Sequence, residues 1–542
     1  MTAYSFKGIL NREVSIQQLR DPKVWDMIII GGGATGLGIA LDAASRGYKT
    51  LLLEKNDFSH GTSSRSTKLA HGGVRYLAQG NISLVLEALR ERGLMIQNVP
   101  HLVHMVPFVI PSYRWWEKFY YGIGLTIYDW MAYKFRFGKT KVISRQKVKN
   151  IFDNLNTNSL NGGVIYYDGQ FDDSRMSINI AQTASEKGGT LLNYFNVDQF
   201  IMKDGKVDGV MATDLESGEV FSIRSKTVVN ATGVFADNIL KLIDEDEKPI
   251  IKVSQGVHLI LDRHFLKSNH ALMIPKTRDG RILFIVPWKE RLLVGTTDTP
   301  LDGPSDEPKA LKEEIDFILE TIEDYLVKKP ELNDILSVFA GLRPLVQPRK
   351  SKEGTKEISR DHKLIIDHTN LLTITGGKWT TYRKMAQDTV DHAIKIGNLN
   401  KVKCTTDTLK IHGSAHVNPT NDHLSVYGSD AEGIRELAKK EHGLAKILHP
   451  KFPHIMAEVV WFIRYEMART VEDILARRLR ILFLDARVAI DIAPKIAAVL
   501  AVELNKEKSW EYAQTEVFSN IAQNYLATPY KKTSTIEKIK IK

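Results

Sequence analysis

The feature that most constrains the fold is a glycine-rich turn near the start of the chain, Gly31-Gly32-Gly33-Ala34-Thr35-Gly36. Gly31 permits a tight turn, and Gly33 lets backbone N–H groups approach a pyrophosphate. Gly36 allows the following helix to pack closely against the preceding strand. An apolar run over residues 24–30 predicts that buried strand, and residues 37–46 predict the helix. The pattern predicts a dinucleotide site in which a helix N-terminus faces the phosphates.

A second apolar strand, residues 48–53, follows the helix and ends at Glu54. Strand, helix and strand form a βαβ unit, so the chain is expected to belong to the α/β class. The carboxylate of Glu54 is placed to accept hydrogen bonds from ribose hydroxyls. It disfavours a 2′-phosphate and hence NADP, which leaves NAD and FAD as candidates.

A stretch of hydroxyls, cations and glycines, residues 61–76, comes soon after the second strand. It can supply further phosphate donors, and its glycines leave a backbone that is thin enough to lie along a flat ring. A plain NAD-dependent dehydrogenase has no need of such a stretch at this place. The segment therefore favours FAD.

The amino-acid composition limits which cofactors and binding partners are expected. The chain has 542 residues, enough for roughly two to four domains, and its single cysteine, Cys404, cannot form an internal disulfide. Without a cysteine cluster for zinc or iron–sulfur we expect no metal, so redox chemistry must use an organic cofactor. The net charge of +10 suits an acidic substrate, an anionic membrane surface or nucleic acid. We expect no nucleic-acid binding, because the cations are interleaved with acidic residues.

The expected cellular location of the protein depends on two kinds of apolar run, both of which the sequence lacks. No window approaches the roughly 18 uninterrupted apolar residues that a spanning helix needs. The segment 1–21 lacks the apolar run of a secretory signal. We therefore expect a cytoplasmic protein.

Residues 63–76 resemble the signature of FAD-dependent glycerol-3-phosphate dehydrogenases, within the D-amino-acid-oxidase-like, glutathione-reductase-type FAD superfamily. The resemblance spans roughly residues 20 to 500 and continues in further motifs: Asp172-Asp173-Ser174-Arg175, Asn230-Ala231-Thr232-Gly233, Ser254-Gln255-Gly256-Val257-His258, Gly295-Thr296-Thr297-Asp298, Gly341-Leu342-Arg343-Pro344-Leu345, residues 375–383 and residues 466–473. It implies that sn-glycerol 3-phosphate is oxidised to dihydroxyacetone phosphate by hydride transfer to FAD, with electrons passed to a membrane quinone.

The same resemblance implies an α/β fold with a Rossmann-type FAD-binding domain, a mixed-sheet substrate domain and an α-helical C-terminal domain. We expect these segments along the chain: FAD-binding parts at 20–100, 161–250 and 346–400, an aromatic-rich segment at 101–160, the substrate domain at 251–345, the helical domain at 401–530 and a basic tail at 531–542. Within them, residues 206–214 and 220–231 predict a hairpin, and residues 429–524 read as almost wholly helical.

The cofactor-binding residues are expected where glycines or hydroxyls end a strand or open a helix. The segment at residues 230–233 would bring the chain back beside the dinucleotide, and residues 375–381 would turn a helix N-terminus toward the flavin. The predicted set is Gly31, Gly33, Gly36, Glu54, Ser63, Ser64, Thr67, Lys68, Leu69, Val197, Gly233, Gly377 and Thr380.

The substrate phosphate carries about two negative charges and needs fixed cations. Arginine suits it because the guanidinium donates two parallel hydrogen bonds. The resemblance places Arg75 and Arg343 in the substrate pocket, with Lys378 nearby, and Tyr76 is expected to orient the substrate. His258 completes the predicted substrate-binding set.

Catalysis also needs a base for the proton of the C2 hydroxyl. His71 and His258 are the candidates by residue type, and Lys378 would serve if burial lowered its pKa. The sequence does not decide which of these three residues is the base. The predicted catalytic set consists of these three residues and Arg343, whose charge holds the substrate.

An aromatic segment around residues 113–121 is interleaved with Arg114 and Lys118. It fits an interfacial anchor on the inner face of the cell membrane, which would bring the protein to its quinone, and it fits a buried aromatic cluster equally well. The lysines of the tail would add weak attraction to anionic lipid. A homodimer is left open.

Other functions stay in view. A glycerol-3-phosphate oxidase that passes electrons to oxygen would share nearly every motif. An FAD-dependent amino-acid or hydroxy-acid oxidoreductase would use an arginine for a carboxylate instead. A flavin-binding protein without catalysis is disfavoured, because His71, Arg75, Arg343 and Lys378 would then have no evident use.

Overall fold

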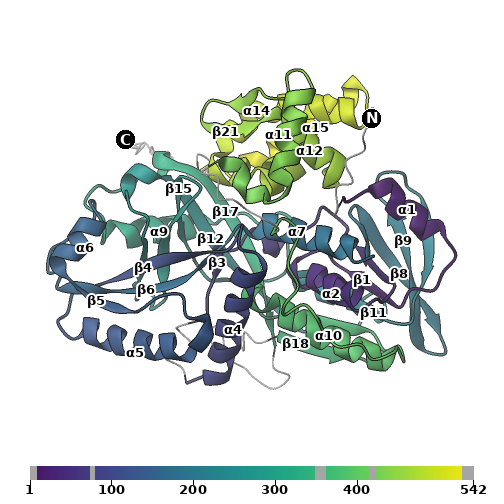
Figure 1. The fold of residues 1–542 in the computed structure, drawn as a ribbon, viewed down its shortest axis with the longest axis horizontal. Coiled ribbons are helices and arrows are strands. Elements are labelled where there is room, and N and C mark those ends of the chain that lie inside the picture. The colour runs from purple at the N-terminus through teal and green to yellow at the C-terminus, as the bar shows by residue number, and fades with distance from the viewer. Residues whose placement is uncertain (1–8, 74–79, 348–361, 415–421, 528–542) are drawn as a thin grey trace, which may run out of the picture.

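The glycine-rich turn follows β1, a strand of a six-stranded sheet (Figure 1). The computed structural model describes residues 9–73, 80–347, 362–414 and 422–527. Within them the order of this sheet is β18-β19-β11-β1-β2-β7. Its strands are β1 (Met27–Ile30), β2 (Thr50–Leu53), β7 (Thr190–Leu192), β11 (Val228–Asn230), β18 (His362–Ile366) and β19 (Leu372–Gly376). Because β1 pairs in parallel with β2, the predicted βαβ unit is confirmed.

Helix α2 (Ala34–Ser45) connects β1 and β2 and packs between α7 (Asp173–Glu186) and α10 (Tyr382–Ile396). Its small residues allow this, since a Cβ at Gly38 would lie 2.9 Å from the ring of Tyr382. The helix ends before Gly47, whose φ of +85° is the left-handed geometry that glycine adopts without strain. The N-terminal helix α1 (Arg12–Arg20) lies farther along the same half of the molecule (Figure 1).

The predicted hairpin forms a small sheet in the order β10-β9-β8, of strands β8 (Phe195–Lys203), β9 (Lys206–Asp214) and β10 (Val220–Arg224). Its second arm is shorter than expected. After Arg224 the chain leaves this sheet, and β11 joins the six-stranded sheet beside β1. The apolar run at 227–229 was therefore the signal of another strand rather than of a longer hairpin.

A ten-stranded mixed sheet builds the other half, in the order β16-β12-β15-β14-β13-β4-β6-β3, with β17 on β12 and β5 on β6. Its strands are β3 (Leu69–Ala70), β4 (His104–Ser112), β5 (Lys141–Ser144), β6 (Gly162–Gln170), β12 (Ile251–Asp262), β13 (Ala271–Ile274), β14 (Leu283–Trp288), β15 (Arg291–Gly295), β16 (Thr299–Leu301) and β17 (Ile335–Val346). Strand β6 pairs with β4 along its whole length. The expected boundary at residue 161 thus falls just before a strand of this sheet, and the chain returns to the FAD-binding half with α7.

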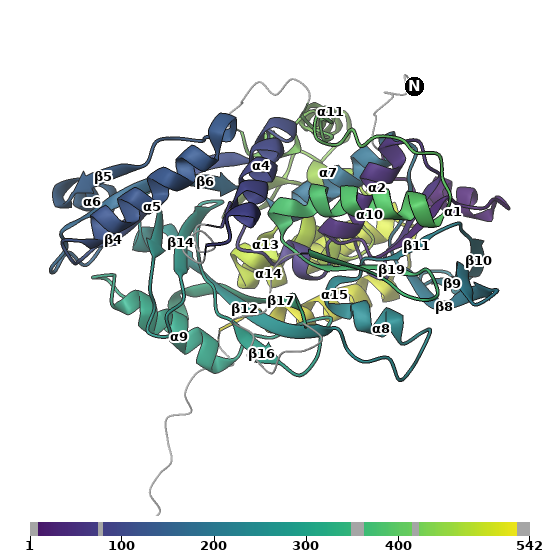
Figure 2. The same cartoon turned by 90° about the horizontal axis from the view of Figure 1, so that it is seen from below.

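Helices cover this second sheet, namely α4 (Ile82–Asn98), α5 (Glu117–Met131), α6 (Arg145–Ile151) and α9 (Lys312–Glu323). Helix α4 packs on α5 through a small apolar cluster; α4 lies near the middle of the molecule beside α10, and α5 lies farther out in this half (Figure 2). Among the described residues, no helix is long and apolar enough to cross a membrane.

The C-terminal part lies over the junction of the two halves (Figure 1). It contains α11 (Asp430–Lys440), α12 (Met456–Tyr465), the π-helical turn η8 (Asp473–Arg478), α13 (Ile481–Leu484), α14 (Ala486–Glu503) and α15 (Lys508–Gln523). A short hairpin of β20 (Ile447–His449) and β21 (Phe452–Ile455) interrupts the predicted helical run. The α/β fold with an FAD sheet, a mixed substrate sheet and a helical C-terminal domain is confirmed.

Candidate active site

A cavity of about 710 Å³ lies where the two large sheets meet. It lies within the size range of ligand sites, roughly 300–1,000 Å³. The ends of β1, β11 and β19 line one side, and β12 and β17 line the other. The C-terminal ends of parallel strands are where open α/β sheets bind their ligands.

The glycine-rich turn forms one wall of this cavity. Gly31 has a φ of +108°, and a Cβ there would lie 2.8 Å from the carbonyl oxygen of Ala231. Gly31 and Gly33 line the cavity at the start of α2. Gly36 lies outside the lining, and a Cβ there would collide with the carbonyl of Gly31. This placement supports the expected division between phosphate approach at Gly33 and close packing at Gly36.

The carboxylate of Glu54 closes the turn from the neighbouring strand. Its oxygens accept hydrogen bonds from the N–H groups of Gly32, at 2.5 Å, and Asn56, at 2.8 Å. Burial raises the pKa of Glu54, and the two backbone donors oppose that rise. A carboxylate has about four lone-pair positions, so acceptor capacity remains for ribose hydroxyls.

The loop after β2 packs onto the turn through Ser63. The hydroxyl of Ser63 accepts a hydrogen bond from the N–H of Ala34 at 2.9 Å, and its carbonyl accepts one from the indole of Trp379 at 2.8 Å. Ser63, Thr67, Leu69 and His71 all line the cavity.

Two predicted cofactor residues of this loop, Ser64 and Lys68, do not line the cavity. The ammonium group of Lys68 is buried and donates to the carbonyl of Ser64 at 2.8 Å and to the carboxylate of Asp173 at 2.7 Å. Burial lowers the pKa of Lys68 to about 7. A contact of either side chain with the cofactor stays a prediction, while the structure shows both packed beneath the loop.

The remaining predicted cofactor residues come from distant parts of the chain. Val197, Gly233, Gly377 and Thr380 all line the cavity. Gly377 has a φ of +71°, and a Cβ there would collide with the sulfur of Met385. The short helix η6 (Trp379–Thr381) and then α10 follow, so a helix start lies at the cavity wall.

This wall fits a dinucleotide cofactor. A turn in which glycine is sterically required lies at the N-terminus of α2, an acidic strand end lies beside it, and a second helix start lies at the same cavity. Backbone N–H groups and helix dipoles at such positions bind pyrophosphate and stabilise negative charge.

The opposite wall carries Arg343, on β17. Its guanidinium forms an ion pair with Asp298 at 3.2 Å and donates to the hydroxyl of Thr296 at 3.1 Å. A Cβ at Gly256 would collide with the guanidinium, so the glycine makes room for it. Lys378 lines the cavity as well.

His258, on β12, is buried at the same wall. Its Nε2 atom lies 2.9 Å from the hydroxyl of Thr67, and its ring stacks on Phe339 with centroids 5.0 Å apart. Its Nδ1 atom has no hydrogen-bond partner among the described residues. Burial, reinforced by the charges of Lys68 and Arg343, holds the pKa of His258 well below its ordinary value. The ring is therefore neutral at pH 7.

The structure thus brings His71, His258, Arg343 and Lys378 to one cavity. The predicted substrate residues Arg75 and Tyr76 lie outside the described residues.

Comparison with known proteins follows this geometry. Residues 26–383 match the family model of FAD-dependent oxidoreductases, and residues 368–511 match that of the C-terminal domain of alpha-glycerophosphate oxidase. The mitochondrial glycerol-3-phosphate dehydrogenase of Mus musculus is 39% identical over 530 residues, which cover 91% of this chain and 72% of that protein. That of Arabidopsis thaliana is 40% identical over 528 residues, covering 89% of this chain and 84% of that protein. The chain belongs to the family of FAD-dependent glycerol-3-phosphate dehydrogenases.

A solved structure agrees with this membership. The glycerol-3-phosphate dehydrogenase from Bacillus halodurans, complexed with FAD, superposes with a TM-score of 0.77 at 27% identity. The match covers 97% of this chain and 99% of that one. FAD is accordingly the cofactor of this dehydrogenase, as predicted.

Sequence reasoning assigned no role to several residues at or beside this dehydrogenase's cavity. Asp298 lies in a motif quoted for the resemblance, yet nothing in it indicated the ion pair with Arg343. Phe339 and Trp379 position His258 and Ser63 through a ring contact and a hydrogen bond. Trp379 lies within the quoted motif at residues 375–383, and Phe339 lies two residues before the motif that begins at Gly341, which was the available signal.

Proposed function

We propose that this protein oxidises sn-glycerol 3-phosphate to dihydroxyacetone phosphate in the cavity between its two large sheets. The observation that carries the proposal is one cavity that holds a dinucleotide cradle on one wall and Arg343, Lys378 and a neutral His258 around the rest. This combination suits a phosphorylated alcohol, which needs cations for its phosphate and a base for its hydroxyl.

Each residue of the cavity has its own proposed role in this reaction. Arg343 and Lys378 bind the substrate phosphate and so fix the distance of the C2 carbon from the cofactor wall. His258 is the proposed acceptor of the C2 hydroxyl proton, because its uncharged ring lines the cavity beside the cofactor wall. Bound FAD supplies the two-electron acceptor for the hydride at C2. The helix start at Thr380 would present its dipole to the negative charge that develops on reduced FAD.

The electrons are proposed to pass on to a membrane quinone, and α5 supports contact with a bilayer. This helix turns a continuous apolar face outward, with Trp130 72% and Ile123 66% exposed. Its other side is buried through Leu125 and Tyr128. The exposed apolar set, which we call the α5 face, is Trp115, Trp116, Phe119, Tyr120, Ile123, Ile127, Trp130 and Tyr133.

The surroundings of the α5 face favour an anionic lipid surface. Arg114, Lys134, Arg136, Lys139 and Lys141 are exposed around it, whereas the acidic Asp129 of the same helix is buried. An amphipathic helix with aromatic residues and flanking cations lies in the membrane interface with its apolar face in the lipid. We therefore propose peripheral attachment to the inner face of the cell membrane from the cytoplasm. A homodimer stays a prediction.

Dye-linked turnover tests the substrate. We expect glycerol 3-phosphate to support turnover with an artificial electron acceptor, and glycerol, lactate and alanine to fail. Turnover with lactate or alanine but not with glycerol 3-phosphate would assign the cavity to a carboxylate substrate. Stoichiometric hydrogen peroxide in air without the dye would instead identify an oxidase.

A further inference from the structure

The C-terminal domain contacts the FAD-binding half at the back of one cavity wall. We call residues 54–67 the cavity segment; ten of its residues line the cavity, namely Glu54, Lys55, Asn56, His60, Gly61, Thr62, Ser63, Arg65, Ser66 and Thr67. Two of its other residues, Asp57 and Ser64, contact the C-terminal domain. We propose that Arg477, Arg478 and Arg480 of that domain position the cavity segment, so that retention of FAD depends on them.

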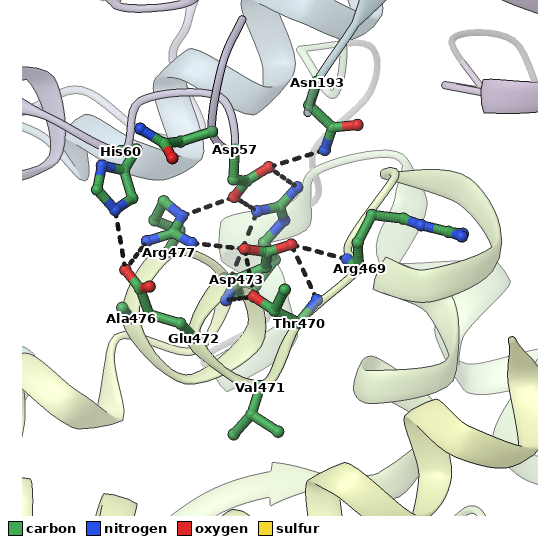
Figure 3. Close-up of polar contacts among 12 residues, drawn as sticks. Asp57, His60, Asn193, Arg469, Thr470, Val471, Glu472, Asp473, Ala476 and Arg477 are labelled. Atoms are coloured by element: carbon green, nitrogen blue, oxygen red, sulfur yellow. Dashed lines mark hydrogen bonds and ion pairs between the residues drawn. The ribbon is translucent and has the colours of Figure 1, made fainter. Parts of the chain in front are cut away.

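The first anchor is Asp57, whose side chain is fully buried. Arg477 donates to its carboxylate from Nε at 2.6 Å, and Arg478 forms a second ion pair with it. Figure 3 shows Asp57 between Arg477 and the amide of Asn193, which donates at 3.3 Å. Asp57 lies three residues after Glu54, so the arginines fix the backbone directly behind the ribose-binding carboxylate.

A second contact lies beside the first. The ring of His60, which lines the cavity, lies 3.4 Å from the carboxylate of Glu472. Glu472 also pairs with Arg477 at 2.5 Å (Figure 3). One arginine of the π-helical turn η8 thus reaches the cavity segment directly through Asp57 and, by way of Glu472, at His60.

The third contact is made by Arg480, which is completely buried and has a φ of +67°. Its guanidinium donates to the carbonyl of Ser64 at 2.6 Å and to Asp173 of α7 at 3.1 Å. Lys68 donates to the same carbonyl. A buried carbonyl that receives two donors, one of them a guanidinium, is held more firmly than one in an ordinary backbone hydrogen bond.

This third contact leads straight to the dinucleotide turn. Ser64 follows Ser63, and the hydroxyl of Ser63 accepts a hydrogen bond from Ala34 in the first turn of α2. A chain of contacts therefore runs from Arg480 through Ser64 and Ser63 to the helix start that faces the cofactor phosphates. Arg480 and Ser64 are 416 positions apart in the sequence, so this contact joins distant parts of the chain.

Not every ion pair of this interface touches the cavity segment. Arg469 of the same domain pairs with Glu216 at 2.7 Å, in the turn between β9 and β10. That pair also joins the C-terminal domain to the FAD-binding half, yet Glu216 does not line the cavity. Arg469 is therefore a matched control, because its loss weakens the interface without reaching the cofactor.

The inference rests on the proposed place of FAD, and it is tested without substrate. Purified holoenzyme is diluted into buffer without FAD, and the rising fluorescence of released FAD gives the dissociation rate. Arg480→Met should release FAD about tenfold faster than the wild type, the order expected when one hydrogen bond from a charged donor is lost. Arg480→Lys should restore much of the difference, and Arg469→Met should release FAD at the wild-type rate.

Folding of the key variant is supported by its surroundings. After Arg480→Met, Asp173 still pairs with Lys68 and Asp172 still pairs with Lys289, so no buried carboxylate is left alone. If Arg480→Met fails to fold, Arg480→Lys decides: its FAD release should be faster than that of the wild type, though by less than tenfold, at a melting temperature close to that of Arg469→Met. Unchanged release from the Arg480 variant, or equal acceleration by Arg469→Met, overturns the inference. Neither result bears on which substrate the enzyme oxidises.

Discussion

The Nε2 atom of His258 lies 2.9 Å from the hydroxyl of Thr67, and this contact joins the two halves of the molecule across the cavity. Thr67 belongs to the loop that follows β2, whereas His258 belongs to the long strand β12 of the substrate sheet. The residues are 191 positions apart in the chain. The pair places the proposed base at the edge of the cofactor wall.

Replacement of His258 tests its role as the base. His258→Asn should lower the rate of flavin bleaching by glycerol 3-phosphate by about 10²- to 10⁴-fold, the usual contribution of general-base catalysis. FAD content should stay at the wild-type level, since the asparagine amide can still bond to Thr67. His264→Asn is the matched control, because His264 follows the same strand with its side chain 40% exposed. A wild-type rate in His258→Asn would transfer the role to another group, with His71 as the next candidate.

Arg343 should dominate binding of the substrate phosphate. Arg343→Ala should weaken kcat/KM for glycerol 3-phosphate by about 2–5 kcal/mol, the cost of removing one partner of a buried charge pair. The kcat/KM of Arg343→Lys should lie between those of the wild type and Arg343→Ala, because lysine keeps the charge but loses the bidentate geometry. Steady-state kinetics with a dye as electron acceptor measure kcat/KM for both variants. Unchanged KM and turnover in Arg343→Ala would remove this residue from the site.

A buried histidine outside the cavity predicts how stability depends on pH. His412 bonds to Asp430 at 2.9 Å and to Glu186 at 2.7 Å. Although burial opposes it, these two carboxylates raise the pKa of His412 from 6.5 to about 9. A raised pKa stabilises the folded state fully below the unfolded value near 6.5, and this contribution is lost as pH rises through about 9.

The contribution of His412 is on the order of 3 kcal/mol at pH 6, from the conversion of pKa shift to free energy. The melting temperature of wild type should exceed that of His412→Gln most clearly at pH 6, and the gap should shrink toward pH 9.5. A gap that grows with pH would contradict the assignment of His412 as the charged partner.

The α5 face should control attachment to lipid. Ile123→Ser, Ile127→Ser and Trp130→Ser in one chain should reduce co-sedimentation with vesicles of anionic phospholipid about tenfold or more, since each removes a large apolar side chain from the lipid interface. Turnover with a water-soluble dye should not change. A control triple variant replaces Val502, Tyr512 and Val517 by serine, because these are also exposed but lie in the C-terminal domain. Equal loss in both triple variants, or none in the first, would sink the proposal.

Local signals in the sequence predicted the glycine turns that line the cavity. The turn at Gly31 and the glycine pair at Gly377 each need an unusual backbone, and such needs are visible in a few consecutive residues. The strands and the long helices followed from apolar periodicity in the same way. The resemblance supplied the substrate, which periodicity alone does not reveal.

Contacts between distant segments were beyond the sequence. Nothing near Lys68 shows that its ammonium turns under the loop toward Asp173 instead of toward the cofactor. The positioning role of the arginines at 477, 478 and 480 has no local signal, because their partners in the FAD-binding half, Asp57 and Asp173, are more than 300 residues away. The outward orientation of the α5 face depended on which side of the helix meets the substrate sheet, and only the fold decides that.

The central claim is that one cavity holds FAD against glycerol 3-phosphate. The most direct measurement is the visible absorbance of the purified holoenzyme under anaerobic conditions as glycerol 3-phosphate is added. The account predicts that the flavin absorbance bleaches and that one dihydroxyacetone phosphate forms for each FAD, whereas glycerol and lactate have no effect. A protein that binds no FAD, or whose flavin stays oxidised with glycerol 3-phosphate in excess, would contradict it.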